Sequence, residues 1–327
     1  MLTDRFGRTH DYLRISLTDK CNLRCSYCMP YDLPKGFYAN APKMSAVEID
    51  SIVSVFVKLG IKKVRLTGGE PLIRRDFRDI IHLLSKYPVE LVVTTNGIYL
   101  DEFIDDFKKN GIRSVNVSLD TLSKSKFFEI TKRDYFDRIM KNIHLLLVND
   151  FQVKVNIVLM KNINDNEILD FVAWTKDIPL HLRFIEFMPF NGNRWEKEKI
   201  VVQDEALEKI KECYKVIKLK DELQDTAKKY KISEHAGTFA FISTVSQPFC
   251  SGCNRIRLTS DGKLRNCLFS QSEIEILGPL RKGENIIPLI QNSVKRKELM
   301  LGGQRDFDAV VPGLESDTER AMVSIGG

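Results

Sequence analysis

Six cysteines in two triplets constrain this chain more than any other feature. The chain has 327 residues and seven cysteines, and six of these form the groups Cys21-x3-Cys25-x2-Cys28 and Cys250-x2-Cys253-x13-Cys267. A four-iron cubane that is held by three thiolates leaves its fourth iron free for a non-protein ligand. A structural metal site usually closes its coordination sphere with protein ligands. The two triplets therefore predict two [4Fe-4S] clusters, each open to a small molecule.

Zinc is the main alternative for either triplet, because CxxC pairs are common in zinc ribbons. Each triplet would then need a fourth ligand, and none of the five histidines has knuckle spacing from the cysteines. The odd cysteine count, and the lack of a signal-peptide-like start or a membrane-spanning apolar run, disfavour disulfides. We therefore expect a cytoplasmic protein with no membrane contact. We interpret Cys213 as an ordinary half-buried thiol.

The composition is that of an ordinary globular chain, with 43% hydrophobic and 29% charged residues. A chain of this size buries a large core without metal staples, so the cysteines are not explained by a small fold. The net charge of +6 suits an anionic small substrate at least as well as nucleic acid. We find no basic stripe rich in aromatic residues, of the kind that RNA-binding platforms use, and expect no nucleic-acid partner.

Strand and helix patterns alternate up to about residue 215. The predicted strands cover residues 12–17, 63–67, 90–94, 114–118, 152–159 and 181–187, with helical patterns between them. Six βα units in series predict a parallel sheet, either doubly wound or an incomplete barrel with fewer than eight strands. After about residue 220 the alternation stops, and a hairpin with its turn at Ser260-Asp261-Gly262 carries part of the second triplet.

Basic side chains inside the predicted strands favour the barrel. Arg14, Arg65, Lys154 and Arg183 lie in four different strands. Charged residues in the middle of parallel strands are unexpected in a dry core. One such residue would fit an edge strand, but four predict a cavity that binds an anion. We therefore predict an α/β chain, with an incomplete (βα)6 TIM-like barrel over residues 1–220 and a smaller α+β portion over residues 221–327.

A glycine-rich string, Thr67-Gly68-Gly69-Glu70-Pro71, follows the second predicted strand. Alone, such a string indicates a turn. Together with the first cysteine triplet and the aromatic Tyr27 before its third cysteine, it resembles the radical S-adenosylmethionine (SAM) superfamily. The resemblance implies that SAM binds the open iron of the first cluster. Glu70 is then expected to help bind an ammonium group at the carboxyl ends of the strands, where such barrels have their active sites.

The second triplet narrows this resemblance, because most members of the superfamily lack it. With the run Cys253-Asn-Arg255-Ile-Arg257 and the terminal Gly326-Gly327, it is similar to the GTP 3′,8-cyclase family of molybdenum cofactor biosynthesis. The resemblance covers nearly the whole chain. It implies two [4Fe-4S] clusters and SAM as cofactors.

The resemblance also implies a role for each matching residue. Cys21, Cys25 and Cys28 would bind the SAM cluster, and Cys250, Cys253 and Cys267 a second cluster whose open iron contacts guanine. The residues expected at SAM are Tyr27, Gly69, Glu70, Ser118 and Met188. Those expected at GTP are Arg14, Arg65, Thr94, Lys154, Arg183, Arg255, Ile256 and Arg257. Those expected to take part in catalysis are Arg14, Arg65, Lys154, Arg255, Arg257, Gly326 and Gly327, with the terminal glycines reaching into the site.

The implied reaction is a radical cyclisation of GTP. One electron from the first cluster would cleave SAM to methionine and a 5′-deoxyadenosyl radical, which removes hydrogen from the ribose 3′ carbon of GTP. The carbon radical would add to guanine carbon 8, and reduction would give the cyclised nucleotide. The implied partners are a flavodoxin- or ferredoxin-like electron donor and the next pathway enzyme, cyclic pyranopterin monophosphate synthase. A homodimer stays open.

Two other functions compete with this interpretation. One is a radical SAM enzyme that modifies a peptide and uses the second cluster for electron transfer. Such enzymes tend to have more cysteines in the C-terminal region than the three found in this chain. The other is a zinc or iron–sulfur module that binds nucleotide or RNA without catalysis, which would leave the Gly68-Gly69-Glu70-Pro71 string without a role. Metal content and SAM binding distinguish this second function.

Overall fold

The computed structural model describes residues 1–29, 43–304 and 320–326. All six strands predicted from the sequence are present, each within one residue of its predicted ends. They are β1 (Tyr12–Ser16), β2 (Lys63–Thr67), β3 (Glu90–Thr95), β4 (Ser114–Ser118), β5 (Gln152–Leu159) and β6 (His181–Glu186). Each pairs in parallel with the next, so that Arg14 lies beside Arg65 and Asn116 beside Lys154. The predicted parallel α/β fold is confirmed.

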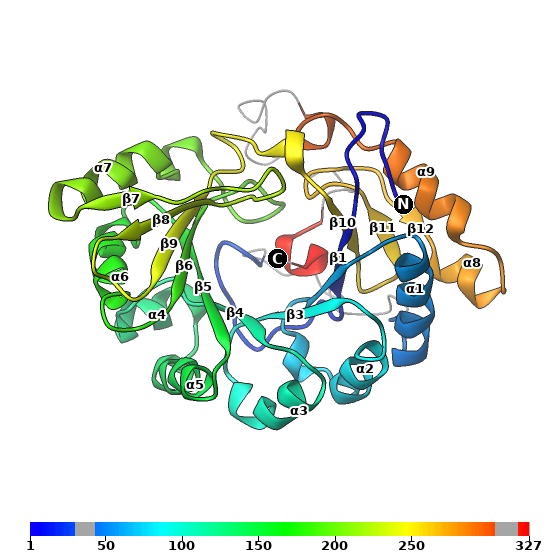
Figure 1. Ribbon diagram of the computed structural model, residues 1–327, viewed down its shortest axis with the longest axis horizontal. Helices are drawn as coiled ribbons and strands as arrows, with labels where there is room; N and C mark the ends of the chain where they lie inside the picture. The colour runs from blue at the N-terminus through cyan, green and yellow to red at the C-terminus, as the bar shows by residue number, and fades with distance from the viewer. Residues whose placement is uncertain (30–42, 305–319, 327) are drawn as a thin grey trace.

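Helices cover the outer face of this sheet (Figure 1). The first, α1 (Ala46–Lys58), begins with a capping box in which Ser45 and Glu48 each accept a hydrogen bond from the other's backbone N–H. The others before residue 215 are α2 (Phe77–Leu84), α3 (Ile104–Lys109), α4 (Lys124–Thr131), α5 (Phe136–Val148), α6 (Ile168–Trp174) and α7 (Gln203–Cys213). No helix in the described ranges is long and apolar enough to cross a membrane.

Cys213 is exposed, so the expectation of a half-buried thiol was wrong. It is the last residue of α7, beyond Ile210, the final position of that helix which is buried against the sheet. All seven cysteines are free.

The C-terminal part of the chain extends the same sheet at both edges. Its strands are β7 (Val216–Lys218), β8 (Lys228–Ile232), β9 (Thr238–Ile242), β10 (Arg255–Leu258), β11 (Lys263–Arg265) and β12 (Ile274–Glu275). The predicted hairpin is β10 and β11, but β10 also pairs in parallel with β1, and β9 pairs in parallel with β6. The described strands thus form one sheet in the order β12-β11-β10-β1-β2-β3-β4-β5-β6-β9-β8-β7. The sequence analysis did not predict these two parallel pairings, nor β7, β8 and β12.

Three helices accompany these strands: α8 (Leu277–Arg281), α9 (Ile287–Lys295) and α10 (Met322–Ile325). The first two lie outside the sheet. The short α10, red in Figure 1, lies instead in the middle of the ring that the curved sheet forms.

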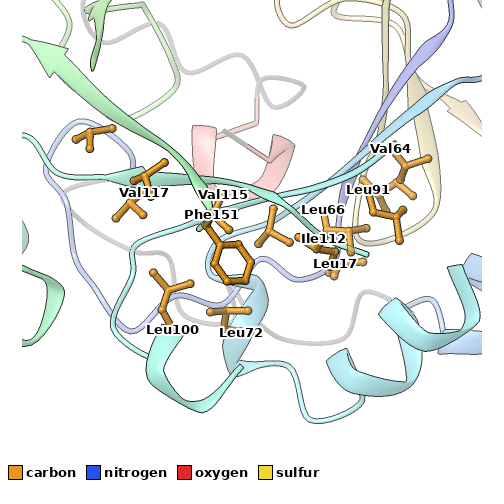
Figure 2. Close-up of a cluster of buried hydrophobic side chains, with 14 of the residues drawn as sticks. Leu17, Val64, Leu66, Leu72, Leu91, Leu100, Ile112, Val115, Val117 and Phe151 are labelled. Atoms are coloured by element: carbon orange, nitrogen blue, oxygen red, sulfur yellow. The ribbon is translucent and has the colours of Figure 1, made fainter. Parts of the chain in front are cut away.

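Alternate residues of the strands have opposite character. Val64, Leu66, Val115 and Val117 are completely buried and pack with the helices in the apolar core that Figure 2 shows. Burying a valine or leucine side chain contributes roughly 1.5–3 kcal/mol. Since neighbouring residues of a strand point to opposite faces, Arg65 lies on the other side of the sheet, toward the lumen. The outer apolar layer stabilises the sheet, so its inner face is available for polar residues.

Candidate functional site

A cavity of about 390 Å³ lies in the lumen of the curved sheet. The four basic residues predicted to line such a cavity all do so. Seven of the residues expected at GTP line the cavity: Arg14, Arg65, Thr94, Lys154, Arg183, Arg255 and Arg257. Ile256 is fully buried and does not line the cavity, because it points to the opposite face of β10 from its two arginine neighbours.

The cations of this lumen repel one another. Burial and the Arg183 charge lower the pKa of Lys154 to about 8. Burial and the Arg65 charge lower the pKa of Arg183 to about 9, and burial with the Arg257 charge lowers the pKa of Arg14. All three pKa values are lowered, as expected for cations that lie close together and are shielded from water. A bound polyanion would relieve this repulsion.

Several guanidinium donors around the cavity have no hydrogen-bond partner. The Nε atoms of Arg14 and Arg183, Nη2 of Arg183 and Nη1 of Arg255 are buried and unpaired within the described part of the chain. Buried polar groups almost always have a partner, and an unsatisfied one costs about 1–3 kcal/mol. Orphaned donors on three side chains around one cavity indicate a binding site for a ligand rich in hydrogen-bond acceptors.

Tyr12 is a lumen residue that the sequence analysis missed. Its phenolic oxygen accepts a hydrogen bond from Nε of Arg65, whose Nη1 donates to Thr94 Oγ1 at 2.8 Å. The Arg255 guanidinium carbon lies 5.4 Å from the centre of the Tyr12 ring. Burial opposes ionisation of the phenol, but the charges of Arg65 and Arg14 outweigh it and lower its pKa to about 7. The sequence feature that could have identified Tyr12 as a lumen residue is its position two residues before Arg14, on the same face of β1.

The affinity for GTP, the ligand that the sequence resemblance implies, is expected to fall as the pH rises above about 7, because ionised Tyr12 would repel the triphosphate. The negative charge of the bound triphosphate would raise the pKa of Tyr12 above about 7, so binding above that pH takes up a proton to restore the neutral phenol. The Tyr12→Phe variant lacks the ionisable phenol. Any pH dependence that comes from ionisation of GTP itself is the same for this variant and the wild type. Calorimetry between about pH 6 and pH 9 should therefore show a steeper loss of affinity in the wild type than in Tyr12→Phe. Equal slopes would contradict the assignment.

The loop that carries the first cysteine triplet follows β1 and packs against the glycine-rich string after β2. The Gly69 N–H donates to the Thr18 carbonyl at 2.6 Å, and the Glu70 N–H donates to the Lys20 carbonyl at 2.8 Å. A Cβ atom at Gly69 would overlap the Lys20 carbonyl oxygen and lie 2.7 Å from its carbon. The glycine therefore permits a close approach between two backbone segments, and this approach fixes the cysteine loop.

The first three thiols are grouped but do not converge on a point. Burial, followed by the Glu70 charge, raises the pKa of Cys21 to about 11, and burial also raises the pKa values of Cys25 and Cys28. Among the described residues, no three His, Cys, Asp or Glu side chains are placed to bind a single metal ion. A cubane binds each thiolate through a different iron and so holds the sulfurs further apart. Three neighbouring thiols are the donor set of a [4Fe-4S] cluster whose fourth iron takes a non-protein ligand.

Glu70 lies next to this loop, and its carboxylate is already hydrogen-bonded. It accepts from the Leu72 N–H at 3.0 Å, the Thr95 hydroxyl at 2.8 Å and the Asn96 N–H at 2.7 Å. Burial raises its pKa to about 7 despite these donors. Asn96 Nδ2 in turn lies 3.9 Å from the Cys21 sulfur. Glu70 thus connects the ends of β2 and β3 beside the first triplet.

The other residues expected at SAM lie around the same end of the sheet. The Tyr27 hydroxyl is hydrogen-bonded to Asp120, whose carboxylate also accepts from the Val158 N–H at 2.8 Å. Ser118 ends β4, and Met188 lines the lumen cavity. Asp120 was missed by the sequence analysis, because only the tertiary fold brings it to Tyr27.

The second triplet opens onto the lumen cavity, which Cys250, Cys253 and Cys267 all line. The Lys297 ammonium donates to the Cys253 sulfur at 3.3 Å, and the Leu301 N–H donates to the Cys250 sulfur at 3.4 Å. Burial opposes ionisation of Cys253, but the Lys297 and Arg255 charges lower its pKa to about 7. Three thiols with donors already directed at two of them suit an iron–sulfur cluster that is exposed to the cavity.

The C-terminal segment through Gly326 lies in the lumen (Figure 1). The Arg257 guanidinium donates to the Gly326 carbonyl at 2.8 Å. Gly326 has φ of 82°, and a Cβ atom there would lie 2.9 Å from Thr67 Cγ2 and 3.0 Å from Ser16 Cβ. Glycine is suited to both the left-handed backbone and the narrow space. Gly327, also expected in the site, lies outside the described residues.

Arg320 anchors this terminus and provides a prediction. Its guanidinium binds Asp261 at 2.7 Å and Glu273 at 2.7 and 2.8 Å. Charge-assisted hydrogen bonds contribute about 1.5–3 kcal/mol, so Arg320→Met should release the terminus and reduce turnover by about 10-fold or more. Arg281→Met, which removes the exposed pair with Glu48, is the control. Limited proteolysis and turnover assays measure the effect. Arg320→Met protein that is as resistant to protease and as active as the wild type would contradict the prediction.

Family models match both parts of the chain. Residues 15–175 match the radical SAM superfamily, and residues 180–301 match the family described as Molybdenum Cofactor Synthesis C. Streptococcus suis SuiB bound to S-adenosylmethionine has a similar fold, with a TM-score of 0.60 at 14% identity over 88% of this chain and 68% of SuiB.

Curated relatives are much more similar. The mitochondrial GTP 3′,8-cyclase of Arabidopsis thaliana is 43% identical, over 100% of this chain and 84% of the relative. The GTP 3′,8-cyclase of Peptoclostridium acidaminophilum is 41% identical, over 91% of this chain and 92% of the relative. Human molybdenum cofactor biosynthesis protein 1 is 44% identical over 92% of this chain, which spans about half of the human protein. The chain belongs to the GTP 3′,8-cyclase family of the radical SAM superfamily.

Proposed function

We propose that this chain is a lyase that cyclises GTP to (8S)-3′,8-cyclo-7,8-dihydroguanosine 5′-triphosphate, the first step of molybdenum cofactor biosynthesis. One observation carries the proposal. The lumen cavity combines unpaired guanidinium donors of Arg14, Arg183 and Arg255 with the thiols of the second triplet. A triphosphate is rich in acceptors and charge, and the guanine of the same molecule would lie toward the cysteines.

Two groups of residues are proposed to hold the cofactors. Cys21, Cys25 and Cys28 would bind a [4Fe-4S] cluster, with SAM among Tyr27, Gly69, Ser118 and Met188, and the second triplet would bind a second [4Fe-4S] cluster. When bound and reduced, the first cluster supplies the electron that splits SAM into methionine and the 5′-deoxyadenosyl radical. Glu70, whose carboxylate accepts hydrogen bonds from Leu72, Thr95 and Asn96, is proposed to position the loop of the first cysteine triplet for SAM.

The lumen residues are proposed to orient GTP for the cyclisation. Arginine provides a planar fork for phosphate oxygens and lysine a point charge, so Arg14, Arg65, Lys154 and Arg183 would bind the triphosphate. Thr94 is held by Arg65 at the same wall. With the phosphates fixed, these residues would set the ribose and the guanine of GTP in one orientation for the cyclisation. Fixed orientation of this kind lowers a barrier by removing translational and rotational freedom.

Arg255, Arg257 and the terminal glycines are proposed to complete the site. Arg257 lines the cavity together with the second triplet and donates to the Gly326 carbonyl at 2.8 Å, whereas Val323 of the terminal segment lies in a cluster that packs with Cys21 and Cys28 of the first triplet. A terminus of small residues would exclude water from the radical without filling the substrate space. In this proposal residues 1–220 supply the SAM site, and residues 221–327 the second cluster and part of the GTP site.

Partners and location follow from this chemistry as further parts of the proposal. A flavodoxin- or ferredoxin-like protein would supply single electrons, and a cyclic pyranopterin monophosphate synthase would consume the product. The free cysteines suit a reducing compartment such as the cytoplasm. No membrane or nucleic-acid partner is proposed, and a homodimer is compatible with the chemistry.

Mass spectrometry of the anaerobically reconstituted protein tests the function. The protein would receive SAM, a reductant and either GTP or ATP. We expect 5′-deoxyadenosine and a cyclised nucleotide of unchanged mass with GTP, and neither with ATP. Deoxyadenosine without a nucleotide product would reject GTP as the substrate and favour a peptide-modifying enzyme. Neither product, from protein that holds both clusters, would favour a binding module.

A further inference from the structure

Lys297 is a buried lysine whose partners belong to the proposed second cluster site. Only 3% of its surface is exposed. Its Nζ donates to the Cys253 sulfur at 3.3 Å and to the Arg255 carbonyl at 2.8 Å. In the part of the chain that the structure describes, no carboxylate lies within ion-pair distance of this amine. Buried lysines are rare unless paired, so the sulfur is the group placed to balance this charge.

The position of Lys297 is fixed from several sides. It follows α9 by two residues, and its backbone N–H donates to the Val294 carbonyl at 3.0 Å. The adjacent segment contributes the Leu301 N–H to the Cys250 sulfur. Arg8 fastens this segment, because its guanidinium donates to the carbonyls of Cys250 at 2.8 Å and Leu299 at 2.9 Å. The ammonium is therefore held at the sulfur by the fold, and its position does not depend on a flexible surface side chain.

We propose that Lys297 raises the reduction potential of the second cluster by placing a fixed positive charge and a hydrogen bond at the Cys253 thiolate. Reduction adds an electron to the cluster, and a nearby cation stabilises the more negative state. Hydrogen bonds to the sulfurs and local net charge are two of the factors that set such potentials. The inference rests on the proposed second cluster. It assigns Lys297 as a positioning and electrostatic residue that contacts a cluster ligand.

An EPR-monitored redox titration of the enzyme with both clusters tests the proposal. The second cluster is identified as the signal that GTP changes, and the first as the one that SAM changes. Lys297→Met keeps the length of the side chain without its charge, and should shift the midpoint potential of the second cluster to a more negative value. The potential of the first cluster should stay unchanged. Lys297→Arg should keep the second potential near that of the wild type.

Lys295→Met is the matched control, because Lys295 is an exposed lysine two residues before Lys297, at the end of α9. It should move neither potential. An unchanged second potential in Lys297→Met, or an equal shift in Lys295→Met, would overturn the proposal. Loss of the second cluster in Lys297→Met with full iron in Lys297→Arg would support a need for the charge. Loss of the second cluster in both Lys297→Met and Lys297→Arg would overturn the proposal and indicate a steric role for Lys297. Wild-type protein with iron for only one cluster would instead reject the cofactor assignment itself.

Discussion

Arg183→Met is expected to weaken GTP binding by about 10- to 100-fold, because a hydrogen bond to a charged group contributes about 1.5–3 kcal/mol. Arg183 lines the lumen, and its Nε and Nη2 are buried without a partner among the described residues, so these donors are available to the acceptor atoms of a bound ligand. Its pKa of about 9 keeps it charged at neutral pH. Calorimetry with GTP under anaerobic conditions measures the effect.

The affinity for SAM should be unchanged in Arg183→Met, because the first cysteine triplet lies at a different part of the site. Arg138→Met is a suitable control. Arg138 is a partly exposed arginine on α5 that pairs with Asp101 and Glu102, and it does not line the cavity. Its loss should leave both affinities intact. Wild-type GTP affinity in Arg183→Met, in a protein with normal iron content, would remove the basis of the lumen assignment.

Gly69→Ala is expected to abolish the first cluster, or to weaken SAM binding by at least about 10-fold. The added Cβ would overlap the Lys20 carbonyl oxygen, which is backbone and has no alternative rotamer. Overpacking of this kind typically costs about 1–3 kcal/mol, and relief requires the Cys21 loop to move away from β2. That movement would also break the hydrogen bonds from Gly69 to Thr18 and from Glu70 to Lys20.

Iron content, SAM affinity and thermal unfolding measure this effect. Gly278→Ala is the matched control, because a Cβ atom at Gly278 meets its nearest neighbour, Glu275, at 3.8 Å. Gly278 lies within α8, where alanine is favoured over glycine by roughly 0.5–1 kcal/mol. The control should therefore keep its iron and gain slightly in stability. Normal iron and SAM affinity in Gly69→Ala would show that the loop does not need this close approach.

The sequence predicted those parts of the fold and site that depend on local spacing. Strands β1 to β6 follow from short-range alternation, and they appear within one residue of the expected ends. The lumen position of Arg14, Arg65, Lys154 and Arg183 follows from the same alternation, because a strand has only two faces. The cysteine groups are equally local, since the spacing within each loop limits what its thiols can bind.

No local pattern in the sequence predicts the contacts between distant segments. Pairing of β10 with β1 joins residues more than two hundred positions apart, and neither strand differs in pattern from an ordinary edge strand. The meeting of Lys297 with Cys253 depends on how the segment after α9 packs beside β10, and that of Tyr27 with Asp120 on the order of β1 to β4 in the sheet. Tyr12 has an apolar pattern in the sequence, and its environment becomes polar only when Arg65 and Arg255 surround it.

The sequence by itself therefore determined the chemistry that this protein carries: two sets of three thiols, a basic face on successive strands, and a short glycine string after β2. The tertiary structure decided how these parts meet. It extended the wall of the lumen with β9 and β10, brought Arg257 to the Gly326 carbonyl and left donors of Arg183 without a partner among the described residues. The physical reason is range. Strand alternation and loop spacing act over a few residues, whereas burial, charge crowding and hydrogen-bond satisfaction are properties of the assembled core.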